Sequence, residues 1–246
     1  MLSILYYLFT LLQVTFLFIL SIIVLVVTYP FDKSRRWVHE CSRWICAILY
    51  GVPPYIRRTI DGVENIEKDK PYVMVMNHNS GCDIFAAYKI PLNFRWVSKR
   101  EVFRVPFMGW LLPIHGDIPI ERGNAAKAME KVLREGKLWL GRGVSVAIFP
   151  EGTRSKTGEM GRFKAGAFNL AAEAGVDILP IVMTGTNELF NGWKVNWCNR
   201  VAIRVLPAVK AESVAATDTK ELMQQVHDTM VDALAQLREE VKAEKK

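Results

Sequence analysis

The feature that most restricts how this chain can fold is its uncharged, apolar beginning. Residues from Leu2 to Tyr29 carry no charged side chain, and the first charge in the sequence is Asp32. A helix over this run would be about 40 Å long at ~1.5 Å per residue, more than the ~30 Å hydrocarbon core of a bilayer requires. The sequence therefore predicts a membrane-anchoring helix, or a helical hairpin formed with the segment that follows.

The flanks of this run indicate a retained anchor with a defined orientation. The chain starts Met-Leu-Ser without a basic residue, and the run ends on the bulky Tyr29 and Phe31, unlike a cleavable signal. Four basic residues follow closely: Lys33, Arg35, Arg36 and Arg43. The positive-inside rule then places the rest of the chain in the cytoplasm, at the cytoplasmic (inner) membrane. The aromatic residues Trp37, Trp44 and Tyr50 favour a second, interfacial segment.

Composition limits the classes of protein that the remainder can belong to. Half of the 246 residues are hydrophobic, which excludes intrinsic disorder, and the formal net charge is +7. The positive excess lies between residues 32 and 164 and is interleaved with acids. This pattern favours anionic headgroups or phosphorylated substrates over nucleic acid, with a generic solvated basic surface as the alternative. The four cysteines form no C-x-x-C pair, so we expect neither disulfides nor a structural metal.

Short β-rich runs alternate with helical patterns along the rest of the chain, which is typical of an α/β domain. The runs cover residues 55–60, 72–76, 94–97, 117–120, 145–149, 178–183 and 201–206. Asn124 predicts the cap of one helix, and Asp218 with Glu221 forms a capping box for a terminal one. We therefore expect an anchor and interfacial segment over residues 1–54 and a single mixed α/β domain over residues 55–246.

The first candidate for chemistry directly follows an apolar strand. Residues 77–83 read Asn-His-Asn-Ser-Gly-Cys-Asp, at a strand end where α/β proteins build ligand sites. On a regular helix His78 and Asp83 would point about 140° apart, so their pairing requires an irregular turn between them. A paired imidazole could remove a proton from a substrate hydroxyl. The alternatives are a capping box at Ser80 and Asp83 with a structural histidine, or a nucleophilic Cys82.

Three further blocks follow in the sequence, and none of the usual hydrolase, P-loop, zincin or dinucleotide motifs is present. Residues 116–122 read Gly-Asp-Ile-Pro-Ile-Glu-Arg, residues 149–155 read Phe-Pro-Glu-Gly-Thr-Arg-Ser and residues 179–182 read Leu-Pro-Ile-Val. The proline in the 116–122 block predicts an edge strand. Together with the His78 block, these resemble the glycerolipid acyltransferase family, specifically the 1-acyl-sn-glycerol-3-phosphate acyltransferases. The fourth block departs slightly, with Leu179 where the family often has Val or Ile.

The resemblance implies a reaction and its partners. A fatty acyl group would pass from a thioester of acyl carrier protein or coenzyme A to the sn-2 hydroxyl of lysophosphatidic acid, giving phosphatidic acid. His78 would be the general base and Asp83 its orienting partner, with no cofactor beyond the acyl donor as co-substrate. Besides these substrates, the implied partner is the membrane lipid bilayer, with no nucleic acid.

The same blocks supply groups suited to a phosphorylated acceptor. Because the guanidinium fork matches phosphate oxygens, Arg122 and Arg154 are candidate clamps. Glu151, Gly152 and Thr153 beside Arg154 are further candidate substrate-binding residues. The resemblance adds Lys99, which is similar to a family lysine near this site. Backbone N–H groups from Asn79 to Gly81 are candidates for stabilising an oxyanion.

Several alternatives remain open from the sequence. The acceptor could be another lysolipid, such as a lyso-ornithine lipid, and a thioester hydrolase would release free fatty acid without an acceptor. A basic module that only binds anionic lipid would need no chemistry from His78. The apolar residues within 103–112 could line an acyl channel, rest in the bilayer or pack in the core.

Overall fold

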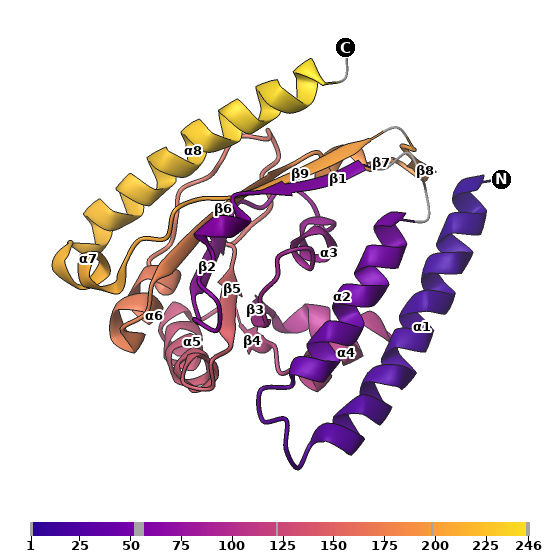
Figure 1. Cartoon of the computed structure of the whole chain (residues 1–246), viewed down its shortest axis with the longest axis horizontal. Coiled ribbons are helices and arrows are strands. Elements are labelled where there is room, and N and C mark those ends of the chain that lie inside the picture. Colours follow the sequence, from indigo (N-terminus) through magenta and orange to yellow (C-terminus); the bar gives the residue numbers. More distant parts are fainter. Residues whose placement is uncertain (1, 52–56, 122, 198, 245–246) are drawn as a thin grey trace.

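The computed structural model describes residues 2–51, 57–121, 123–197 and 199–244, and within them a seven-stranded sheet forms the centre of the molecule (Figure 1). The strands are β1 (Arg57–Asp61), β2 (Val73–Met76), β3 (Phe94–Lys99), β4 (Ile118–Ile120), β5 (Ser145–Ile148), β6 (Ile178–Thr184) and β9 (Arg200–Val205). Their order across the sheet is β1-β9-β6-β2-β5-β3-β4. All seven predicted β-rich runs are confirmed as strands, although residues 55–56 lie outside the described residues.

The direction of the strands fixes where a site can form. Strands β6, β2, β5, β3 and β4 run parallel to one another. Strand β9 is antiparallel to β6 and pairs in parallel with β1. The carboxyl ends of the five parallel strands therefore meet at one edge of the sheet. Strand β4, which contains Pro119, is at the border of the sheet, as the proline predicted.

Each strand divides its side chains between two hydrophobic cores. In β2, Val73 and Val75 enter the core beneath α5, α6 and α8, whereas Met74 and Met76 enter the opposite core beside α2 and α3. The helices beside the sheet are α3 (Asp83–Ala87), α4 (Met108–His115), α5 (Ala125–Leu140), α6 (Gly166–Ala174), α7 (Ala211–Ala216) and α8 (Thr219–Ala243). Both predicted caps are confirmed, because Asn124 accepts from Lys127 N and Asp218 from Glu221 N.

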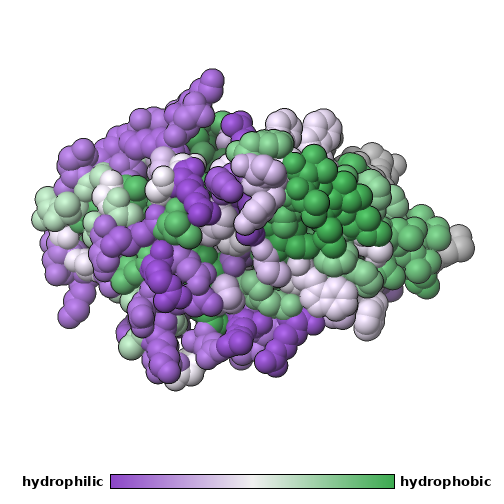
Figure 2. Space-filling model, turned by 90° about the horizontal axis from the view of Figure 1, so that it is seen from below, coloured by the Kyte–Doolittle hydropathy of each residue, from purple (hydrophilic) through white to green (hydrophobic). Residues whose placement is uncertain are grey.

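The apolar N-terminus forms a helical hairpin at one end of the molecule (Figure 1). Helix α1 (Leu2–Thr28) is, among the described residues, the one helix long and apolar enough to cross a membrane. Helix α2 (Arg36–Gly51) returns antiparallel to it and confirms the predicted second segment. The domain boundary predicted at residue 54 lies outside the described residues. In Figure 2, hydrophobic side chains gather over the end of the molecule that carries this hairpin, and hydrophilic ones cover the other end.

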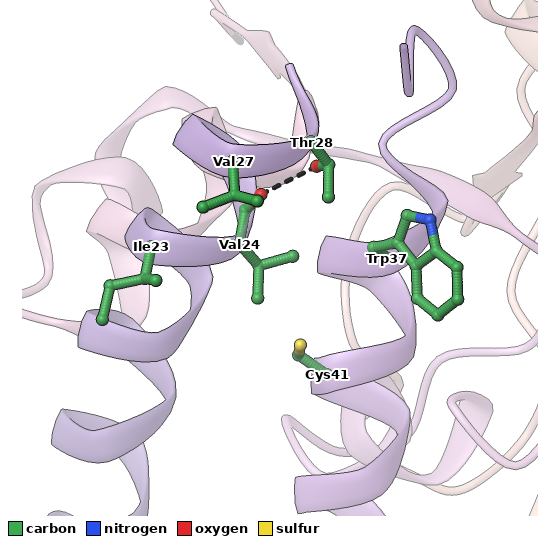
Figure 3. Close-up of a pocket in the computed structure, with 6 residues that line it drawn as sticks. All are labelled: Ile23, Val24, Val27, Thr28, Trp37 and Cys41. Atoms are coloured by element: carbon green, nitrogen blue, oxygen red, sulfur yellow. Dashed lines mark hydrogen bonds between the residues drawn. The ribbon is translucent and has the colours of Figure 1, made fainter. Parts of the chain in front are cut away.

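The two helices of the hairpin leave an apolar pocket between them near the elbow (Figure 3). It has a volume of about 290 Å³ and is lined by Ile23, Val24, Val27, Thr28, Trp37 and Cys41. The hydroxyl of Thr28 donates to Val24 O at 2.7 Å, so the polar group of this lining is satisfied within α1.

Helix α1 lies along the sheet domain and contacts it at its beginning and at its middle. At its beginning, the Tyr6 ring meets Trp197 at 5.6 Å between centroids, and Ser3 Oγ accepts from Val195 N in the hairpin of β7 (Phe190–Asn191) and β8 (Lys194–Val195). At its middle, Phe18 packs against Phe107 and Trp110 next to α4. The elbow that follows α1 is also tied down, so the whole helix runs beside the domain.

A buried cation holds that elbow. The guanidinium of Arg95 on β3 donates to the carbonyl oxygens of Ser34 and Phe94, and burial lowers its pKa to about 10. Close by, the carboxylate of Asp117 accepts from Trp96 N at 2.8 Å through Oδ1, while Oδ2 has no hydrogen-bond partner among the described residues. Burial raises the pKa of Asp117 to about 7. This polar cluster lies under the anchor, away from the carboxyl ends of the parallel strands.

Candidate active site

The predicted catalytic blocks meet at the carboxyl ends of the parallel strands. The His78 block follows β2, the block at 149–155 follows β5, Lys99 ends β3, and residues 184–186 end or follow β6. Since these four strands are neighbours in the sheet, their end loops are placed side by side (Figure 1). Polar residues far apart in the sequence therefore share one site.

His78 and Asp83 form the predicted pair. The Nδ1 atom of His78 lies 2.8 Å from Oδ2 of Asp83, across an irregular turn that ends where α3 begins at Asp83. The Asp83 side chain is fully buried and that of His78 is 16% exposed. Because Nδ1–H donates a hydrogen bond to the carboxylate, Nε2 is left as the basic nitrogen. Nε2 makes no hydrogen bond with any described part of the protein.

The carboxylate of Asp83 is saturated with hydrogen-bond donors. Besides the imidazole, its Oδ2 accepts from the backbone N–H groups of Asn79 and Ser80 at 2.7 and 2.8 Å, and its Oδ1 accepts from the hydroxyl of Thr186. Such donors stabilise the charged form of a buried carboxylate. Sequence reasoning missed Thr186, although a polar residue just beyond a strand end was a usable signal.

The imidazole plane is also fixed by aromatic stacking. The His78 ring lies parallel to Phe149 at 3.9 Å between centroids and 11° between planes, and Phe149 stacks in turn on Trp96 at 5.0 Å. This stack leaves the ring little freedom to rotate away from Asp83. Phe149 begins the 149–155 block, but no local pattern predicts that it stacks on the histidine.

Glu151 joins the β5 block to the β2 block. Its Oε1 accepts from His78 N at 2.8 Å, and its Oε2 accepts from Gly161 N at 2.9 Å. Burial raises the pKa of this carboxyl. A further backbone bond from Ser155 N to His78 O, at 2.8 Å, closes the link. Both oxygens of Glu151 thus position the backbone that carries the base.

A pocket of about 390 Å³ opens beside the histidine and is rich in polar groups. It is lined by Asn79, Lys99, Thr153, Arg154, Ser155 and Lys156. Three of the predicted substrate-binding residues, Lys99, Thr153 and Arg154, are therefore in one place. The cationic side chains there suit an anionic group such as a phosphate.

Gly152 has a steric role in the loop that carries these groups. Its φ is +69°, a conformation that favours glycine, and a Cβ there would lie 2.8 Å from the ammonium of Lys164. The side chain of Lys164 therefore lies across the loop next to Thr153 and Arg154, where sequence reasoning had not placed it. Lys164 is held there by its own N–H, which donates to Pro150 O at 2.9 Å.

The remaining predictions for this site concern Arg122 and the oxyanion donors. Arg122 lies outside the described residues, so its role as a clamp stays a prediction. The proposal that Asn79 and Ser80 supply oxyanion N–H donors is wrong, because both N–H groups donate to Asp83. In that run, the Gly81 N–H is the one without a hydrogen bond to any described residue.

The nucleophilic role considered for Cys82 finds little support. Burial raises the pKa of the Cys82 thiol, which disfavours the thiolate that a nucleophile needs. Within the described ranges, no group of three or more His, Cys, Asp or Glu side chains is placed to hold a metal ion. The site is built from a base, its carboxylate and nearby cations.

An imidazole paired with a buried carboxylate therefore lies beside a cationic pocket at one edge of an α/β sheet. Residues 57–184 match the Acyltransferase family, which is half of the chain. The chain belongs to this family.

Individual relatives agree with that membership. A 1-acyl-sn-glycerol-3-phosphate acyltransferase of Pseudomonas aeruginosa is 32% identical over 85% of this chain and 80% of its own length. A chloroplastic 1-acyl-sn-glycerol-3-phosphate acyltransferase of Arabidopsis thaliana is 35% identical over 78% of this chain and 54% of its own length. The chain thus spans about half the length of such plant relatives.

A solved structure has the same fold. The crystal structure of the 1-acyl-sn-glycerophosphate acyltransferase of Thermotoga maritima superposes with a TM-score of 0.77, covering 96% of this chain and 95% of that one. Its sequence is 23% identical, so the likeness concerns the fold, including the N-terminal helices.

Proposed function

We propose that this protein transfers a fatty acyl group from a thioester to the sn-2 hydroxyl of 1-acyl-sn-glycerol-3-phosphate, giving phosphatidic acid for phospholipid synthesis. Relatives named for this activity come from a bacterium, yeast, plants and mammals. The observation that carries the proposal is the His78–Asp83 pair beside a pocket that contains Lys99 and Arg154. That pairing of a base with phosphate-binding cations matches an acceptor with a hydroxyl close to a phosphate.

In the proposed mechanism His78 is the general base. Its Nε2 removes the proton of the acceptor hydroxyl as that oxygen attacks the thioester carbonyl, and Asp83 stabilises the imidazolium that forms. The new C–O ester bond forms, the C–S bond breaks, and the proton passes to the departing thiolate. No acyl-enzyme is required. The Phe149 stack and the Asp83 hydrogen bond keep Nε2 directed at the substrate.

The phosphate of the acceptor would bind in the cationic pocket. Lys99 and Arg154 line it, and the Thr153 hydroxyl adds a hydrogen-bond donor. Holding the phosphate positions the nearby hydroxyl, which converts binding energy into rate. Arg122 is a further candidate for this role, and Glu151 and Gly152 shape the loop.

The acyl donor is a thioester of acyl carrier protein or coenzyme A. Both end in the same pantetheine thioester, so the chemistry at His78 does not distinguish them. The cations of the pocket and the nearby Lys164 suit either the phosphates of coenzyme A or an acidic carrier protein.

We place the enzyme at the cytoplasmic membrane with the sheet domain on the cytoplasmic side, as the basic residues after α1 indicate. The contacts of α1 favour insertion into one leaflet. Ser3 and the elbow at Arg35 both contact the sheet domain, yet a spanning helix would carry these two ends to opposite surfaces of the bilayer.

The decisive experiment compares purified wild type with His78→Ala and Arg154→Ala on a panel of acceptors and donors. We expect His78→Ala to lose transfer by about 10³-fold or more while lysophosphatidate binding survives, and Arg154→Ala mainly to raise KM for the acceptor. Substantial transfer by folded His78→Ala protein would refute the base assignment. Preference for an acceptor without phosphate, such as a lyso-ornithine lipid, would refute the acceptor, and fatty acid release without acceptor would indicate a hydrolase.

A further inference from the structure

A group of large apolar side chains is exposed on the sheet domain itself, outside the N-terminal hairpin. Val105 and Trp110 are each 44% exposed and Met108 is 38% exposed. These three residues, here called the α4 patch, lie in and just before the first turn of α4. Exposed large apolar groups gathered in this way mark an interaction surface.

The α4 patch is continuous with the apolar surface of α1. Phe18 of α1 packs at 5.8 Å between ring centroids on Trp110 and at 5.9 Å on Phe107. On the helix, Phe18 lies on the same face as Leu11 and Ile22, seven residues before it and four after it, and both are exposed. The exposed apolar face of α1 and the α4 patch are therefore neighbours. A partner that contacts one of them also contacts the other.

The backbone before α4 adopts a strained conformation at Phe107. Phe107 has φ +58° and ψ −62°, and Met108 N donates to Pro106 O at 2.7 Å, which together make a γ-turn of the rare, strained kind. Phe107 also packs on Trp110 at 5.4 Å. Gly109 is required behind the turn, since a Cβ there would lie 2.2 Å from Val102 O. The strain presents Met108 outward while Phe107 packs inward on α1.

Charge at the border of the patch agrees with a lipid partner. Arg104 immediately precedes the patch, is exposed, and forms no ion pair with the described residues. A basic side chain at the rim of an apolar patch is the arrangement of proteins that lie at the interface of an anionic membrane. The short helix η2 (Arg100–Arg104) links the patch directly to Lys99 in the candidate active site.

We propose that the α4 patch is a second membrane contact, made by the catalytic domain itself, which enters the acyl-chain region of the leaflet that holds α1. Arg104 binds anionic headgroups at its rim. This contact places the pocket of Lys99 at headgroup level, where a lipid acceptor presents its phosphate while its chain stays in the leaflet. The position of the acceptor rests on the proposed function, whereas the membrane contact of the α4 patch does not.

The first test measures acyl transfer by Val105→Glu and Met108→Glu in the full-length protein. The acceptor is either long-chain lysophosphatidate in vesicles that contain anionic lipid, or a short-chain lysophosphatidate that is monomeric in water. We expect the vesicle substrate to be turned over about tenfold more slowly or worse, because a carboxylate resists entry into hydrocarbon, and the monomeric substrate at the wild-type rate. Leu138→Glu on α5, where Leu138 is 51% exposed outside the patch, is the matched control and should change neither rate.

Wild-type rates for both variants on vesicles would overturn the proposal, and so would an equal loss on both acceptors in folded protein. A second measurement is independent of activity. Vesicles with bromine atoms on the acyl chains should quench the fluorescence of wild type more than that of Trp110→Phe, which keeps a ring against Phe18. Equal quenching would also overturn the proposal. If wild type transfers no acyl group at all, the proposed function fails, and the quenching result still decides the membrane contact.

Discussion

Two buried aspartates of this protein, one after β2 and one before β4, have opposite surroundings. Asp83 follows the end of β2 and receives the imidazole of His78, two backbone N–H groups and the Thr186 hydroxyl. Asp117 precedes β4 and receives one backbone N–H, from Trp96, while its second oxygen has no hydrogen-bond partner among the described residues. Both oxygens of Asp83 thus accept hydrogen bonds from the protein. Only one oxygen of Asp117 does so within the described chain, and burial raises the pKa of Asp117 to about 7.

The comparison teaches that burial alone does not assign a role to a carboxylate. At the carboxyl ends of the strands, loops converge and supply donors that keep a charge in place for chemistry. Under the anchor, Asp117 and Arg95 balance one another within a packed core, and the elbow of the hairpin depends on their neighbours. One site is organised for a reaction and the other for attachment of the anchor.

The largest effect should come from Asp83→Asn. The amide cannot stabilise an imidazolium or hold the correct tautomer, so kcat should fall by about 10³-fold with little change in thermal stability. Steady-state transfer assays and a thermal unfolding curve measure both quantities. The same substitution at Asp117 should leave kcat within about twofold of wild type. Equal losses of activity at both positions would show that Asp83 and Asp117 do not differ in their role.

Glu151→Gln should rank second. Its amide presents an NH₂ group to one of the two backbone N–H donors, which leaves that donor unpaired and displaces the backbone of His78. We expect kcat to fall by about 10- to 100-fold with KM for both substrates nearly unchanged. The control is Glu159→Gln, because Glu159 is exposed and contacts only the surface residue Arg238 among the ion pairs of the described chain. A selective rise in KM for the acceptor would instead show that Glu151 binds substrate.

Thr186→Val should have a smaller effect on the same carboxylate. The change removes the single donor to Oδ1 of Asp83 while the other three donors to Oδ2 remain. A loss in kcat of about fivefold is expected. Thr186→Ser keeps the hydroxyl and should recover most of the rate. Failure of serine to recover it would mean that the threonine acts through packing.

The smallest effect on activity, and the clearest on stability, belongs to the pH dependence of Asp117. Its pKa is raised from 3.8 to about 7, so between these values the folded protein retains a proton that the unfolded chain has released. Stability is therefore lost as the pH rises from about 4 to about 7. Asp117→Asn lacks this loss, and its Tm should exceed that of wild type by an increasing margin over this range, reaching about 5 °C or more. A margin that is constant with pH would contradict the assigned titration.

The strands and the catalytic pair could be predicted from the sequence, but the other residues that contact the pair could not. The strands were predictable because each is a short β-branched or apolar run between turn residues, and the pairing of His78 with Asp83 followed from the turn that Asn79 to Gly81 allows. Thr186 and Phe149 were not, because their contact with the catalytic pair depends on β6 and β5 both being neighbours of β2. Strand order arises from packing of the whole sheet, which local patterns do not encode.

The same limit applies to Asp117 and Glu151. Each lies within a block that the sequence singled out, but the partners that define their roles, Trp96 for one and Gly161 for the other, lie in other segments. The oxyanion prediction is wrong for Asn79 and Ser80 for a related reason. A run of backbone N–H groups near a base is available only if no closer acceptor takes them, and Asp83 does.

The dependence of Asp83 on Thr186 has a consequence for the order of events during synthesis. The two residues are 103 positions apart, and α1 precedes both of them in the chain. Chains are made from the N-terminus, so the apolar helix leaves the ribosome and can meet lipid long before β6 is available to complete the site. An unfinished chain is thus captured by the membrane while still incompetent for chemistry. Under the proposed function, the site is therefore completed only when the molecule already lies beside its lipid substrate.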